Sequence, residues 1–111
     1  MSQTFDFIIL ARHNKKFMEL LQNALSSDKD SVLFTDSHKL FFDAQSQTLY
    51  IVPQPGCVKV IPTKITYRAT QKLLNAELDG IMDADVETMH DDIDKNPSFR
   101  SFLERFNRAQ Q

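Results

Sequence analysis

The residues best suited to chemistry are a cluster of acids late in the chain. Between Glu77 and Asp94 the sequence has eight Asp and Glu residues and no Lys or Arg. Carboxylates bind divalent cations, and the run that starts at Asp83 approaches the spacing of a calcium-binding loop. That loop needs a glycine where this chain has Thr88, so the spacing does not predict a calcium site. The acids instead predict a solvated, negatively charged surface.

The other reactive residue types do not define a catalytic site. The chain has one cysteine, Cys57, and three histidines that lie far apart, so the spacing of a zinc site is absent. Two glycines, Gly56 and Gly80, are too few for a phosphate-binding loop or a dinucleotide-binding fingerprint. We therefore expect no enzymatic activity, no catalytic residue, no metal and no cofactor. A site assembled only in three dimensions, for example from Cys57 and a histidine, is left open.

The composition predicts one globular domain over residues 1–111. The sequence is 41% hydrophobic and 25% charged, which is ordinary for a soluble protein. A chain of this length buries about two-thirds of the surface that its unfolded form exposes. No apolar run is long enough to span a bilayer, and no signal-peptide pattern opens the chain. A single cysteine fits a reducing compartment, so we expect a cytoplasmic protein without a membrane partner.

The charges are distributed unevenly along the chain. The sequence has 15 acids and 13 bases, so the residues outside 77–94 have 7 acids and 13 bases. A surface of one sign steers a protein toward a partner of the other sign. We therefore expect a small interaction protein, of the inhibitor, immunity or adaptor type, that docks on another protein. The expected docking residues lie on an acidic helical face: Asp83, Asp85, Glu87, Asp91 and Asp92.

The elements that position these residues include a predicted antiparallel meander over residues 32–62, because short β-branched and aromatic runs alternate there with turn residues. The first strand, Val32 to Thr35, cannot be phased, because the turn at 36–38 fits two or three residues. A four-residue loop at 44–47 pairs Phe42 with Leu49, so Phe41 pairs with Tyr50 on the other face. The central hairpin therefore has a predicted register.

A second four-residue loop at 53–56 continues this meander, because it has proline and glycine where a turn needs them. It places Val58 opposite Ile51 and Val60 opposite Leu49, and Pro62 then ends the last strand. The two loops put the same apolar residues on one face, which we predict to be core: Leu40, Phe42, Leu49, Ile51, Val58 and Val60.

The opposite sheet face carries an aromatic pair, and it supports the alternative function. Phe41 and Tyr50, flanked by Lys39 and Lys59, have the chemistry of a stacking platform for single-stranded nucleic acid. The competing interpretation makes these rings core, covered by a helix or by a second copy of the chain. A homodimer is therefore also left open.

Helical periodicity predicts the segments on either side of the meander. A long helix from Thr4 to Leu25 competes with a strand over Phe5 to Leu10 and a shorter helix capped by Asn14. After the meander, Thr66 caps a helix that ends at Gly80, with Tyr67 on its apolar side.

Asp83 is expected to cap a short helix with Val86, Met89 and Ile93 on one face. Asn96 and Pro97 are expected to begin the last helix, whose apolar side carries four large residues: Phe99, Phe102, Leu103 and Phe106. The predicted fold class is α+β, with an N-terminal helix, a four-stranded antiparallel β-meander and two or three C-terminal helices.

Overall fold

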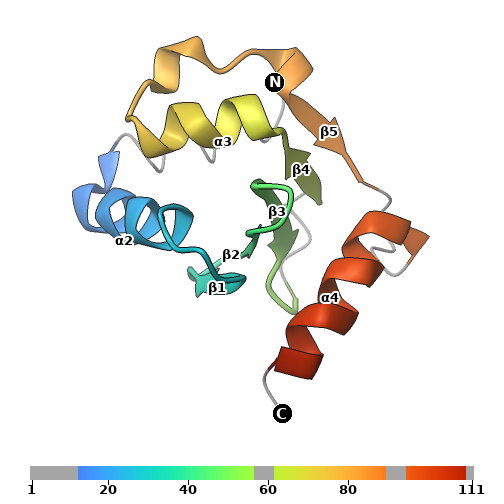
Figure 1. Cartoon of the computed structure of the whole chain (residues 1–111). Coiled ribbons are helices and arrows are strands. Elements are labelled where there is room, and N and C mark those ends of the chain that lie inside the picture. Colours follow the sequence, from blue (N-terminus) through green and yellow to red (C-terminus); the bar gives the residue numbers. More distant parts are fainter. Residues whose placement is uncertain (1–12, 57–61, 90–94, 110–111) are drawn as a thin grey trace.

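The computed structural model describes residues 13–56, 62–89 and 95–109, and it shows an α+β fold built on one antiparallel sheet (Figure 1). The five strands are hydrogen-bonded in sequence order, from β1 to β5. Helices α2 and α3 cover one sheet face, and α4 covers the other (Figure 1). In chain order the elements are α2 (Lys15–Leu25), β1 (Ser31–Phe34), β2 (His38–Asp43), β3 (Thr48–Pro53), β4 (Thr63–Ile65), α3 (Tyr67–Leu74), the 3-10 turns η1 (Leu78–Gly80) and η2 (Asp83–Asp85), β5 (Val86–Thr88) and α4 (Pro97–Ala109).

The register predicted for the central hairpin is confirmed. Strands β2 and β3 pair Phe42 with Leu49 and Phe41 with Tyr50. The connecting loop closes because the Asp43 carboxylate accepts a hydrogen bond from the Gln45 backbone N–H at 3.0 Å. Strand β1, which the sequence left unphased, pairs Leu33 with Leu40, so Leu33 joins the same face as Leu40.

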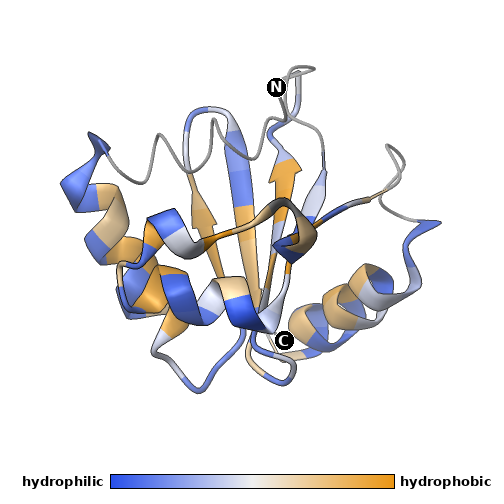
Figure 2. Ribbon diagram, turned by 90° about the horizontal axis from the view of Figure 1, so that it is seen from above, coloured by the Kyte–Doolittle hydropathy of each residue, from blue (hydrophilic) through white to orange (hydrophobic). Residues whose placement is uncertain are grey.

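The two sheet faces form two separate parts of the core. On the face toward α2 and α3, the strands bury Leu40, Phe42, Leu49 and Ile51, as predicted, together with Ile65. Figure 2 shows the hydrophobic colour on the strands and on the helix surfaces near them. The helices contribute these buried residues to this face: Phe17, Leu21, Leu25, Ala69 and Leu73.

The predicted fourth strand is wrong in position. Strand β3 pairs with Thr63–Ile65, which puts Thr63 opposite Ile51 and Ile65 opposite Leu49. Val58 and Val60 therefore do not hold those places, and they lie outside the described residues. Pro62 precedes the strand instead of ending it. Ile65 fits the apolar face of the sheet as well as a valine would. Its neighbour Thr66 caps α3, so a strand that ends at Ile65 leads directly into that helix.

The short helix predicted from Asp83 is also wrong, because Val86–Thr88 forms a fifth strand at the edge of the sheet. Val86 pairs with Ile65, and Glu87 pairs with Lys64 as an opposite-charge neighbour. The spacing of Val86 and Met89 also fits a helix. As a strand, however, Val86–Thr88 pairs with the side of β4 that faces away from β3, and it satisfies the backbone groups of β4 there.

The helix caps settle the remaining alternatives inside the described ranges. Asn14 is extended, and its side chain accepts the Phe17 N–H at 3.0 Å, so a continuous helix through Asn14 is wrong. The choice between helix and strand for residues 5–10 lies outside the described residues. Thr66 caps α3 and Asn96 caps α4, both as predicted. Within the described ranges, no helix has the length and apolar content to cross a membrane.

Helix α3 is shorter than predicted. It ends at Leu74 instead of Gly80, because Ala76 takes a positive φ of 60° that an α-helix does not allow. Tyr67 is 57% exposed, so it does not belong to the apolar side on which the sequence placed it. The buried residues of α3 are Ala69, Thr70 and Leu73.

Candidate functional site

Asp85, which the sequence placed on an acidic docking face, points into the protein. The residue is 4% exposed. Its carboxylate accepts hydrogen bonds from the Met82 N–H at 2.9 Å and from the Thr66 hydroxyl at 3.4 Å. Arg68 lies 3.6 Å from the same carboxylate. Asp85 therefore ties the turn before β5 to the start of α3, and it is unavailable to a partner.

This role makes a stability prediction. We expect Asp85→Ala to lower the free energy of unfolding by about 2 kcal/mol, because it removes the charged acceptor of the Met82 N–H and of the Thr66 hydroxyl. Urea denaturation followed by circular dichroism measures the change. Glu77→Ala is the control, since Glu77 is exposed and its side chain makes no cap hydrogen bond. Equal stability of the two variants would contradict the anchoring role.

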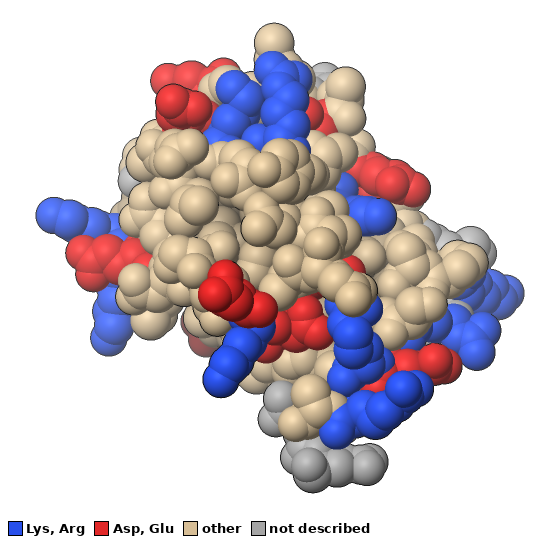
Figure 3. All heavy atoms as spheres, viewed as in Figure 1, with Lys and Arg blue, Asp and Glu red and all other residues tan. Residues whose placement is uncertain are grey.

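Of the other four predicted docking acids, Glu87 is the one whose side chain lies in the described part of the chain. Glu87 is exposed on β5 and stands opposite Lys64. On the face seen in Figure 3, acidic and basic side chains are interspersed around an uncharged central area. The side chain of Asp83, and the whole of Asp91 and Asp92, lie outside the described part. Of the five predicted acids, the structure therefore removes Asp85 from the docking face and leaves Glu87 exposed.

Helix α4 covers the predicted nucleic-acid platform. Tyr50 is 1% exposed, and its hydroxyl donates to Ser98 of α4 at 3.2 Å. Phe41 packs edge-on against Phe99 and Phe102, with ring centroids 5.5 and 5.9 Å apart. Base stacking needs an open ring face, so in this conformation the two rings serve as core.

Of the two lysines predicted for that platform, Lys39 lies in the described part of the chain. Lys39 pairs with Phe34 and Val52 in the sheet, while Lys59 lies outside the described residues, as does Cys57. Lys64, which the sequence did not single out, lies over the Tyr50 ring at 5.7 Å from its centroid.

The free edge of β1 is the surface that the sequence did not reveal. In the described part of the chain, β1 has one strand neighbour, β2. Thr35 N–H donates to the His38 carbonyl at 2.9 Å, and antiparallel ladder bonds alternate along a strand. Leu33 therefore turns its backbone polar groups toward β2, whereas Val32 and Phe34 turn theirs to the open edge.

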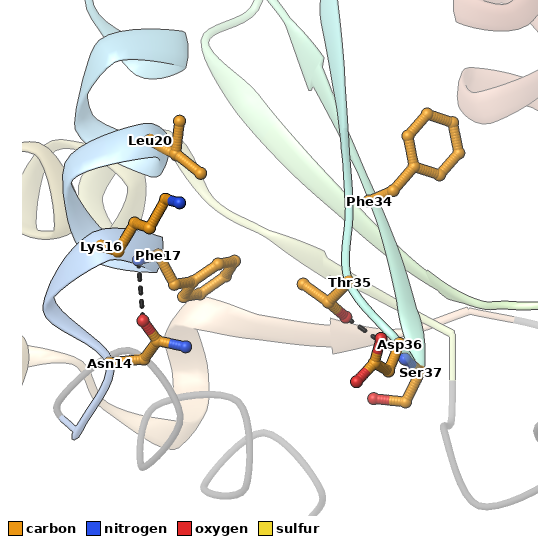
Figure 4. A pocket seen from close by; sticks show the side chains of 8 residues that line it. All are labelled: Asn14, Lys16, Phe17, Leu20, Phe34, Thr35, Asp36 and Ser37. Carbon is orange, nitrogen blue, oxygen red and sulfur yellow. Dashed lines mark hydrogen bonds between the residues drawn. The ribbon is translucent and has the colours of Figure 1, made fainter.

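Two exposed apolar side chains lie on opposite sides of this edge. Leu20 of α2 is 45% exposed, and Phe34 is 60% exposed. Figure 4 shows the Phe34 ring pointing away from α2, so the strand separates the two side chains. Between α2 and the end of β1 lies a cavity of about 380 Å³. Its lining residues are Asn14, Lys16, Phe17, Leu20, Phe34, Thr35, Asp36 and Ser37.

The turn after β1 is held by side chains. The Thr35 hydroxyl accepts hydrogen bonds from the His38 N–H at 2.9 Å and the Ser37 N–H at 3.4 Å. The Ser37 hydroxyl lies 2.7 Å from His38 Nδ1. Adjacent Ser and His residues have little value as a sequence signal, and here they close the turn that forms one wall of the cavity.

The other end of β1 is fixed by Arg105 of α4. Its guanidinium donates to Asp30 at 3.1 Å and to Asp43 at 2.6 Å. These two bonds join α4 to the residue before β1 and to the last residue of β2. Asp30 also accepts the Ala44 N–H at 2.8 Å. The hydrogen bond to Asp30 and the charge of Asp43 raise the pKa of Arg105 above its usual range.

The fold thus defines an α+β protein with a helix-covered sheet, in which the described strands leave the uncharged β1 at one edge. Within the described ranges, no three His, Cys, Asp or Glu side chains gather in a way that could hold a metal ion. Comparison with protein-family models, with curated proteins and with solved structures finds no match.

Proposed function

We propose that this chain is a non-enzymatic interaction module, of the inhibitor, immunity or adaptor type, that docks on another protein. The observation that carries the proposal is the pair of exposed apolar residues, Leu20 and Phe34, on either side of an uncharged edge strand. Single exposed apolar residues are ordinary, but a strand edge between two of them that has no strand neighbour among the described residues is a surface that other chains can cover.

The position of this surface supports docking over catalysis. Thr35 and Asn14, two polar residues that line the cavity, hold the turn after β1 and cap α2. The acidic segment is the second candidate contact region, through Glu87 and the residues around it. Without Asp85 it contributes steering charge, and the apolar edge contributes the buried contact.

Affinity capture from native lysate tests the proposal. We expect Leu20→Lys with Phe34→Lys to reduce recovery of the captured protein about tenfold or more, because two charges would be buried in the contact. The matched control is Tyr67→Lys with Met82→Lys, since these residues are 57% and 58% exposed, Tyr67 at the start of α3 and Met82 just before η2. A third variant reverses Asp83, Glu87, Asp91 and Asp92 and keeps Asp85.

The outcomes separate the candidate functions. Loss of capture only in the edge variant supports the proposal, and loss only in the charge-reversed variant moves the contact to the acidic segment. Each lysate is also treated with nuclease, and capture that disappears with nuclease would favour nucleic-acid binding. If no protein is retained by the unaltered chain in either condition, the proposed function is wrong.

A further inference from the structure

We infer that the open edge of β1 pairs with an extended segment of a partner protein, which adds a sixth strand to the sheet and carries a basic residue opposite Asp36. This inference rests on the proposed function and names the chemistry of its partner. Main-chain hydrogen bonds supply affinity in this mode of recognition, and alternate side chains of the added strand supply specificity.

The two edges of the sheet differ in how well they resist such pairing. Strand β5 has three residues, and one of them, Glu87, is exposed and charged. Strand β1 has four residues, Ser31–Phe34, and contains neither charge nor proline. Natural edge strands are usually blunted by charge, proline, bulges or shortness. The β1 edge therefore favours an added strand more than the β5 edge does.

The side chains around β1 suit alternate residues of an added strand. On the α2 side, Leu20 and the cavity of about 380 Å³ can receive an apolar side chain. On the α4 side, the Phe34 ring offers an exposed surface to a second one. An added strand would thus cover apolar surface on both of its faces, which a contact through one face alone would not do.

The charges beside β1 favour a strand from a partner protein over one from a second copy of this chain. In β1, the residues that turn their backbone groups outward are Val32 and Phe34. Antiparallel pairing of two copies that keeps these apolar residues together therefore places Val32 opposite the second copy's Phe34. The same register brings Asp30 opposite the second copy's Asp36, and like charges directly opposed are unfavourable. Asp30 already binds Arg105, whereas Asp36 is exposed. A partner strand with Lys or Arg opposite Asp36 avoids the repulsion.

The test uses the full chain and a synthetic peptide of alternating Val and Thr with a lysine at each end. Hydrogen exchange should show slower exchange at the amides of Val32 and Phe34 when the peptide is added, with Leu33 unchanged. The same peptide with glutamate ends should bind about tenfold more weakly at low salt. Asp36→Lys should remove this preference, and because Asp36 is exposed the variant should fold normally.

Proline substitutions provide the matched pair. Val32→Pro removes an outward N–H and leaves the ladder to β2 intact, so it should weaken peptide binding about tenfold or more. Thr88→Pro removes an N–H at the opposite edge, because Met89 N–H donates to the Pro62 carbonyl and the alternation turns Thr88 outward. This variant should bind like the unaltered chain. Phe34→Lys serves as the edge variant if Val32→Pro fails to fold.

Four results would overturn the inference. Protection of Val86 and Thr88 would place the added strand on β5, and equal binding by Val32→Pro would exclude backbone pairing at β1. If the unaltered chain sediments as a dimer and Val32→Pro sediments as a monomer, the strand added to β1 would come from a second copy of this chain. Capture of a lysate protein by both proline variants would defeat only the strand inference, whereas absence of capture by the unaltered chain defeats the proposed function.

Discussion

Phe102→Ala is expected to lower the free energy of unfolding by about 4 kcal/mol, the largest effect of any single substitution considered for this protein. Phe102 is fully buried at the centre of the aromatic cluster that joins α4 to the sheet. Its ring lies 5.7 Å from Tyr50 and 5.6 Å from Phe106, measured between centroids. Truncation leaves a cavity that rigid aromatic neighbours fill poorly.

Urea denaturation of Phe102→Ala and Phe34→Ala provides the measurement and its control. Both variants remove the same atoms, but Phe34 is 60% exposed, so its loss should change the free energy of unfolding by less than about 0.5 kcal/mol. A similar small change for both variants would show that α4 does not pack on the sheet. The Phe41 and Tyr50 face would then be open to nucleic acid, and binding should be measured at low salt.

Arg105→Ala is expected to lower the free energy of unfolding by about 3 kcal/mol. Its removal leaves Asp43, which is buried, without the guanidinium that compensates its charge. We place the effect at the lower end for a broken buried pair, because the Arg105 side chain is 36% exposed. Thermal or urea unfolding measures the loss.

Two further variants test why arginine occupies this position. Arg105→Lys should recover part of the stability, because one ammonium cannot reproduce the fork that reaches Asp30 and Asp43 together. Arg100→Ala, on the exposed side of the same helix, is the control and should be nearly neutral. Equal stability of Arg105→Ala and Arg100→Ala would show that the bonds of Arg105 to Asp30 and Asp43 do not stabilise the fold.

Local patterns predicted several parts of the fold because their causes are local. The Phe41 and Tyr50 pairing follows from a loop length and a two-residue alternation, and both operate within a few residues. The caps at Thr66 and Asn96 follow from side chains that reach N–H groups three residues away. The apolar side of α4 follows from helical spacing, and Phe99 and Phe102 are fully buried there.

The failures share a different physical cause. Val86 suits a strand or a helix, and only the open side of β4 decided for the strand. Asp85 has the same side chain as a solvated acid, and only the nearby Thr66 and Met82 made it an internal anchor. In both cases the deciding neighbour comes from another element, so the local sequence does not contain the information.

The sequence by itself determined the register of the central hairpin, the caps of α3 and α4 and the apolar side of α4, since each depends on periodicity and capping over short distances. The tertiary structure alone decided that β1 lies at the edge of the described sheet, that α4 covers Tyr50, and that Asp85 points into the protein. Edges and covered faces depend on which elements become neighbours, and that outcome reflects the packing of the whole chain. The candidate interaction surface was therefore visible only once the strands had been placed in order.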